Sequence, residues 1–182
     1  TTRKIFGIKL NDMDAMTIAG NTYAVAVSQL GRVYTSADGG DNWAESVASL
    51  GPTLYGTLLA PNGNAFVVGL ESNGAAIYKS NYTDLATGGD VSPNLPPAGS
   101  RLNGVSSYDG DNVLAVGLGS VVYRTTDAGH NWTLTTVTVC DGAELFGVSY
   151  FSASFAIAVG ELGCAIKSTD AGATWALLTS PL

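Results

Sequence analysis

The eight residues Ser168-Thr169-Asp170-Ala171-Gly172-Ala173-Thr174-Trp175 decide the fold, because the same pattern occurs twice more in the chain. The pattern is Ser or Thr, any residue, Asp, any residue, Gly, two further residues and Trp. The other copies run from Ser36 to Trp43 and from Thr125 to Trp132. The second and third copies are 43 residues apart and the first two are 89 apart, which indicates a repeat with one degenerate copy.

The missing copy lies in the middle of the chain. Each motif follows a short apolar strand, and Ile77-Tyr78-Lys79-Ser80 fits the same frame before it continues into residues 81–85. Four repeats spaced 43 to 45 residues apart therefore cover the chain. The four equivalent positions are Ser36, Ser80, Thr125 and Ser168.

Two further strands precede the motif strand in each repeat. Central apolar runs cover residues 23–27, 65–68, 113–116 and 156–159. Before them lie the segments Leu54-Tyr55-Gly56, Leu102-Asn103-Gly104 and Leu145-Phe146-Gly147. No stretch shows a helical period. A four-stranded unit of this length has the size of a propeller blade, and it must stack on neighbours to bury both faces. We predict an all-β fold, a β-propeller of four four-stranded blades.

The predicted boundaries place one domain over residues 1–182, with blades near 11–50, 51–98, 99–141 and 142–182. The inner strand of the first blade is ambiguous. Repeat spacing points to Ala15-Met16-Thr17-Ile18, but Ile5-Phe6-Gly7-Ile8 looks more like the other inner strands. We expect residues 1–10 to form an extra strand that closes the ring or reaches a partner. Four blades could close alone, or two chains could pair into a larger ring.

The three motifs resemble the Asp-box repeat of sialidases, sortilin-type receptors and the photosystem II assembly factor group of propellers. Residues 160–175 are especially similar to the last group. In such a turn the Asp accepts hydrogen bonds from turn amides, the Gly supplies a positive φ, and the Trp buries its ring against the neighbouring sheet. We expect a structural role for Ser36, Asp38, Gly40, Trp43, Thr125, Asp127, Gly129, Trp132, Ser168, Asp170, Gly172 and Trp175.

Composition excludes several partners. The chain is 46% hydrophobic and 13% charged, with a net charge of -7 and eight scattered Lys and Arg residues. Nucleic-acid binding needs a basic surface, so neither nucleic acid nor an anionic membrane is an expected partner. No apolar run approaches the roughly 20 residues that span a bilayer, and no signal peptide is visible. The sequence leaves the localisation open.

The two cysteines, Cys140 and Cys164, are too few for a disulfide scaffold or a four-ligand zinc site. We expect two partly buried free thiols, with a single bridge as the alternative. Each Asp-box turn offers one carboxylate rather than a cluster, so we predict no metal site and no cofactor.

A sialidase would use three arginines, a Tyr paired with Glu, and an acid-base Asp. This chain has four arginines in all and lacks the Phe/Tyr-Arg-Ile-Pro motif of that family. Its single histidine, His130, lies inside an Asp-box turn, which argues against a nucleophilic triad. We therefore predict no catalytic residues and expect that the protein is not an enzyme.

Charged residues in loops on the axial face are the candidate binding residues. Four carboxylates fall in the turns between second and third strands or in the connection to the last blade. The candidates are Arg32, Glu71, Arg101, Asp141, Glu144 and Glu161. The Pro- and Gly-containing connection over residues 85–101 is a second candidate, either as a recognition element or as a tolerated insertion.

The resulting hypothesis is a non-enzymatic interaction or structural module. It would bind another protein or its own copies, and a virion surface or tail is one setting. The alternative is a carbohydrate-binding or carbohydrate-cleaving propeller. Clustered aromatics and carboxylates on the axial face would favour the alternative, and an exposed apolar patch would favour a protein partner.

Overall fold

A computed structural model of the chain describes residues 8–45, 50–51, 53–72, 74–82 and 100–178. These residues form β-strands and two short 3-10 turns, with no α-helix among them, which confirms the predicted all-β class. It follows that no described helix could cross a membrane.

The strands form four antiparallel sheets, each built from strands in sequence order. The first holds β1 (Leu10–Ile18), β2 (Asn21–Ser28), β3 (Val33–Ser36) and β4 (Ala44–Glu45). The second holds β5 (Thr53–Leu59), β6 (Asn64–Glu71) and β7 (Gly74–Asn81). The third holds β8 (Leu102–Ser107), β9 (Val113–Gly117), β10 (Val121–Thr125) and β11 (Thr133–Thr136). The fourth holds β12 (Leu145–Tyr150), β13 (Ala156–Gly160), β14 (Ala165–Ser168) and β15 (Ala176–Leu177).

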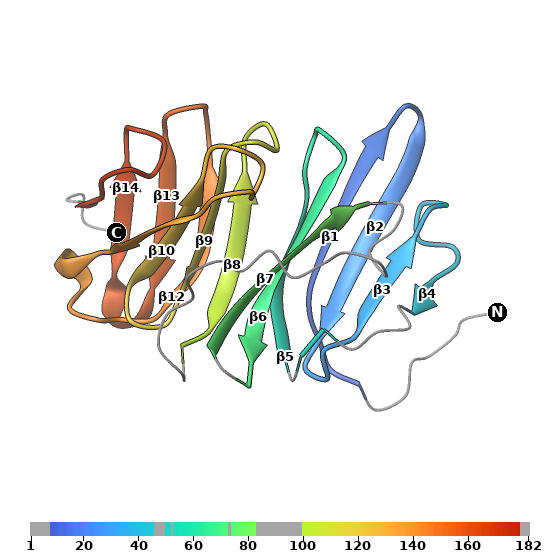
Figure 1. Cartoon of the computed structure of the whole chain (residues 1–182), viewed down its shortest axis with the longest axis horizontal. Helices are drawn as coiled ribbons and strands as arrows, with labels where there is room; N and C mark the ends of the chain where they lie inside the picture. Colours follow the sequence, from blue (N-terminus) through green and yellow to red (C-terminus); the bar gives the residue numbers. More distant parts are fainter. Residues whose placement is uncertain (1–7, 46–49, 52, 73, 83–99, 179–182) are drawn as a thin grey trace.

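The four sheets pack face to face in a row. The inner strand of each sheet contacts the inner strand of the next, in the order β1, β5, β8 and β12. Figure 1 shows the first and last sheets at opposite ends of the molecule, so the row is open rather than closed into a ring.

The core lies between neighbouring sheets. All five residues of β9 are buried, because sheets two and four cover both of its faces. Phe66 and Val68 of the second sheet pack with Leu102 and Tyr123 of the third. Strands that are covered on both sides read as continuous apolar runs, which is why the central strands were recognisable in the sequence.

The inner strand of the first sheet is formed by the residues that repeat spacing indicated. β1 includes Ala15, which pairs with Ala24 of β2, so the strand predicted from repeat spacing is confirmed. The extra strand expected over residues 1–10 falls mainly on residues 1–7, which lie outside the described part. The connection over residues 85–101 is also almost entirely outside it.

The expectation of two free thiols is wrong, because Cys140 and Cys164 form a disulfide. Cys140 ends the turn η1 (Thr138–Cys140), which leads into the fourth sheet. Cys164 follows η2 (Glu161–Gly163), the turn between β13 and β14. The start of β12 pairs with the end of β13, so both turns lie at the same end of one sheet. The Cα atoms are 5.7 Å apart, which is the usual span of a disulfide.

Candidate functional site

A β-bulge occurs at the same place in the inner strand of every sheet. The pairing register shifts after Leu10, Leu54, Leu102 and Leu145 and resumes two residues later. One residue in each inner strand therefore leaves the hydrogen-bonded ladder. A bulge of this kind changes the direction of a side chain and is common beside binding sites. The four bulged residues are Asn11, Tyr55, Asn103 and Phe146.

These four side chains line a single hollow of about 310 Å³. The hollow is completed by Lys9, Arg101 and Glu144, which precede the leucines of their own inner strands. The site thus draws residues from all four sheets. It is built from the two positions that flank the leucine of one repeating frame, and the position after the leucine carries Asn, Tyr, Asn and Phe in the four repeats.

Two of the lining residues form an ion pair. Arg101 donates from Nε to Glu144 Oε1 at 2.6 Å and from Nη2 to Glu144 Oε2 at 2.5 Å. The Glu144 side chain is 6% exposed and that of Arg101 is 37% exposed. The hydrogen bonds from Arg101 hold the buried carboxylate, and those same bonds raise the pKa of Arg101. The guanidinium also lies 5.6 Å from the centre of the Tyr55 ring, a cation–π distance.

Two amide side chains join neighbouring sheets at this site. Asn11 Nδ2 donates to the carbonyl oxygen of Leu54 at 2.6 Å, and Asn103 Nδ2 donates to that of Leu145 at 2.8 Å. Each bond runs from a bulged residue to the leucine position of the next sheet. Asn103 Nδ2 also donates to Glu144 Oε1 at 2.8 Å. These hydrogen bonds hold the two amide groups in place, and the side-chain carbonyl oxygens can still accept hydrogen bonds.

Two of the six predicted binding residues line the hollow, and a third contacts one of them. Arg101 and Glu144 form the ion pair, and Glu161 Oε2 accepts a hydrogen bond from the Glu144 N–H at 3.3 Å. Arg32 instead pairs with Glu45 on the outer strand of the first sheet, at 2.6 Å.

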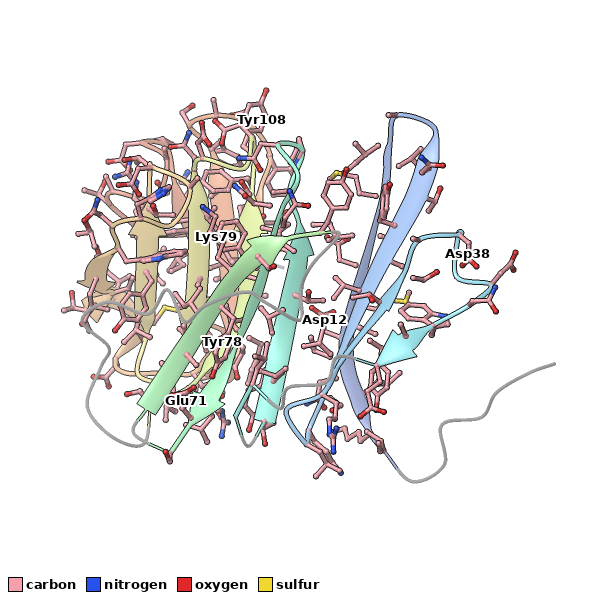
Figure 2. All side chains as sticks on the ribbon, turned by 45° about the vertical axis from the view of Figure 1, so that its right-hand side comes forward. Asp12, Asp38, Glu71, Tyr78, Lys79 and Tyr108 are labelled. Carbon is pink, nitrogen blue, oxygen red and sulfur yellow. A yellow bond between two sulfur atoms is a disulfide. The ribbon has the colours of Figure 1, made fainter. Side chains whose placement is uncertain are left out.

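The other two predicted residues lie elsewhere. Glu71 accepts a hydrogen bond from the Tyr78 hydroxyl at one end of the second sheet (Figure 2). Asp141 follows η1 with a left-handed backbone, φ 50°, and its N–H donates to the carbonyl of Thr138. Neither residue lines the hollow.

Sequence reasoning missed five residues of the hollow. They are Lys9, Asn11, Tyr55, Asn103 and Phe146. A signal for three of them was present, because the aligned Leu-x-Gly segments contain Tyr55, Asn103 and Phe146 at the position that varies. A residue that varies within an otherwise regular frame is not required by the frame itself, and it could have been recognised as a candidate on that ground.

The first and second sheets are tied together by carboxylates rather than by packing alone. The Thr57 N–H donates to Asp12 Oδ2 at 2.9 Å, and the Leu59 N–H donates to Asp14 Oδ2 at 2.7 Å. Figure 2 shows Asp12 between these two sheets. The bonds satisfy backbone donors on the free edge of β5, next to the hollow.

The Ser/Thr-x-Asp turns share one hydrogen-bond pattern, and that of the fourth sheet is representative. The Ser168 hydroxyl donates to Asp170 Oδ1 at 2.8 Å and accepts from the Gly172 N–H at 2.7 Å. Thr174 donates its N–H and its hydroxyl to the two oxygens of Asp170. These bonds lower the pKa of Asp170 to about 2. The equivalent bonds from Asn42 lower the pKa of Asp38 to about 2.

The turns also join neighbouring sheets. The ring of Trp132 meets that of Phe66 of the second sheet edge-on, with centroids 6.3 Å apart. Trp175 packs against the cluster between the third and fourth sheets. No group of three or more His, Cys, Asp or Glu side chains that could hold a metal ion occurs among the described residues.

No protein-family model matches the chain, and no curated protein matches its sequence. Solved structures do match. YCF48 from Cyanidioschyzon merolae superimposes with a TM-score of 0.64 at 14% identity, over 98% of this chain and 62% of that one. An ancestral GH74 enzyme superimposes with a TM-score of 0.73 at 17% identity, over 95% of this chain and 24% of that one. A structure of YCF48 bound to D1 peptide superimposes with a TM-score of 0.58 at 18% identity, over 68% of this chain and 39% of that one.

The chain has the β-propeller fold. At these identities the likeness shows the fold alone. The chain spans between 24% and 62% of these three proteins, so its row of sheets matches only part of each of them.

Proposed function

We propose that the protein is a non-enzymatic binding module that holds a segment of another protein in the hollow at the bulged inner strands. The observation that carries this proposal is the row Asn11, Tyr55, Asn103, Phe146, in which amide and aromatic side chains alternate across four sheets. Amide groups can pair with a peptide backbone, while aromatic rings provide apolar contact at low entropic cost.

The charges of the hollow support a role in binding rather than in catalysis. Both oxygens of Glu144 are engaged by Arg101, and one of them also accepts from Asn103. Hydrolysis of a glycoside would need two carboxylates placed across the sugar bond, and Glu144 is the only carboxylate among the described residues that line this hollow. The peptide-bound structure of YCF48 shows that a propeller of similar fold binds a peptide.

Carbohydrate binding is the second candidate function. The exposed ring of Phe146 and the ring of Tyr55 lie beside amide and carboxylate groups, a combination that suits sugars. The likeness to a GH74 enzyme gives this candidate the same fold-level support.

A parallel screen separates the two candidates. The wild-type chain is tested against a displayed random-peptide library and against a glycan array, together with Phe146→Ala and the control Phe151→Ala. Phe146 lines the hollow and is 52% exposed, whereas Phe151 is 65% exposed and lies outside it. We expect peptide binding that Phe146→Ala weakens at least tenfold and Phe151→Ala leaves intact. Binding of glycans alone would support the second candidate, and equal effects of the two variants would exclude the hollow.

We also propose that the Ser/Thr-x-Asp turns are of the Asp-box type. This is supported by their shared hydrogen bonds and by the Trp packing between sheets.

A structural protein of a virion surface or tail is one proposed setting, because a row of packed sheets suits attachment to an assembly.

A further inference from the structure

Each sheet in the row has two different faces. One face packs on the next sheet and carries Val27, Val68 and Val116 in the first three sheets. The other face packs on the preceding sheet and carries Leu54, Leu102 and Leu145 in the last three. We call them the leading face and the trailing face. Among the described strands, none from another sheet packs on the leading face of sheet four or on the trailing face of sheet one.

The uncovered leading face keeps the apolar residues of the covered ones. Val27, Val68 and Val116 are fully buried, whereas the equivalent Val159 of the fourth sheet is 48% exposed. Ile157 occupies the position of Phe66 and Leu114, which are both fully buried, yet it is only half-buried. Exposed apolar side chains at positions that elsewhere form the core indicate a missing partner.

The trailing face of the first sheet shows the same change along β1 only, because Ala26 and Tyr34 on that face are 2% and 3% exposed. Leu54, Leu102 and Leu145 are fully buried, whereas the equivalent Leu10 is 48% exposed. Met13, on the same face, is also exposed, and its equivalent in the second sheet, Thr57, is buried.

The inner-strand glycines show what should lie against the last sheet. A Cβ on Gly56 would be 2.7 Å from the carbonyl oxygen of Asn103, and one on Gly104 would be 3.0 Å from that of Phe146. Glycine there permits close approach of the next inner strand. Gly147 is the equivalent residue of sheet four, and a Cβ there would meet only Val159, at 3.9 Å. The glycine is present, but none of the described strands lies where the next inner strand would be.

The first sheet carries the matching half of the contact. Gly129 and Gly172, in the turns of sheets three and four, pack on Phe66 and Leu114 of the preceding sheets. The equivalent Gly40 has only Trp43 within 4 Å.

We propose that two copies of this chain pair head to tail, with sheet four of each copy packed on sheet one of the other, to form one closed propeller. A two-fold axis along the ring generates two identical contacts. Ile157 would then meet Gly40 of the second copy, and Gly147 would lie against its β1. Phe146 would lie beside Asn11 of the second copy, which would continue the row of bulged residues around the whole ring. This inference does not rest on the proposed ligand.

The test uses light scattering on the wild-type chain and on two matched glycine variants. The wild type is expected at twice the 18.6 kDa of one chain. Gly147→Val should run as a monomer with unchanged circular dichroism, because inside one chain the new side chain has room. Gly104→Val should lower the melting temperature, because the same side chain would collide with β12 within the chain.

The second face is tested by Leu10→Asp, with Leu162→Asp as its control. Leu162 is an exposed apolar residue of the turn η2 and belongs to none of the strands that form the two end faces, so this control should remain a dimer. Mixing Leu10→Asp with Gly147→Val should restore a dimer through the one intact contact that the mixture retains. A monomeric wild type, an open series of larger assemblies, or a dimer that survives Gly147→Val would each overturn the proposal.

Discussion

At the scale of single residues, the ion pair between Arg101 and Glu144 is the most consequential contact of the hollow. Glu144 is buried and receives three side-chain hydrogen bonds, two of them from Arg101. Removal of Arg101 would leave a carboxylate in the interior with a single side-chain donor. The energetic cost of such a change comes from the unpaired charge rather than from the lost attraction.

We expect Arg101→Ala to lower the free energy of unfolding by about 2–3 kcal/mol, less than a fully buried pair would give because Arg101 is partly exposed. Arg32→Ala is the control. It breaks an exposed pair with Glu45 and should cost less than about 1 kcal/mol. Urea unfolding of both variants measures the difference. Equal effects would mean that burial of Glu144 does not govern the strength of the pair.

At the scale of the turns, the carboxylate of Asp170 makes stability depend on pH. Its pKa is about 2 in the folded chain, whereas that of an ordinary Asp is 3.8. A lowered pKa contributes stability that is present above pH 3.8 and is lost as the pH falls through 2. We expect Asp170→Asn to lower the melting temperature by a few degrees at neutral pH. The gap to the wild type should close between pH 4 and 2. Thermal unfolding across this range is the measurement, and a gap that stays constant would contradict the assignment.

Much of the strand arrangement could be predicted because the repeat is regular. The spacing of the motifs predicted β3, β10 and β14. Each inner strand was expected 12 residues before the last valine of its central strand, and counting back from Val27 gave Ala15, which lies in β1. Burial on both faces made the central strands apolar throughout, which is visible in sequence. The start of β1 at Leu10 was not predicted, because Ile5-Phe6-Gly7-Ile8 offered a competing apolar pattern.

The site was predicted only in part. Arg101 and Glu144, which line the hollow, and Glu161, which contacts Glu144, were named because they are charged residues of predicted axial loops. Tyr55 and Phe146 were not, since an apolar residue in an inner strand looks like core until the bulge that turns it aside is known. The disulfide was missed for a related reason. Cys140 and Cys164 are 24 residues apart, and only the pairing of β12 with β13 brings their turns together. Such bonds persist mainly in oxidising compartments.

At the scale of the whole molecule, ring completion by a second copy would couple stability to protein concentration. Unfolding would then separate two chains, and mass action raises the melting temperature as concentration rises. We expect the wild-type melting temperature to increase over about a hundredfold range of concentration, while that of Gly147→Val stays constant. Scanning calorimetry gives both values. A constant wild-type melting temperature would argue that the folded chain stands alone.

The bulge shared by the inner strands separates what the hollow recognises from what keeps the sheets folded. Tyr55 and Phe146 are outside the hydrogen-bonded ladder, so their replacement alters the wall of the hollow and leaves the pairing of β5 and β12 in place. Ligand preference can therefore change by one substitution at a time, blade by blade, without passing through an unstable intermediate. The bulged positions of the inner strands can vary while the strand pairing stays the same, and related chains could bind different ligands with the same fold.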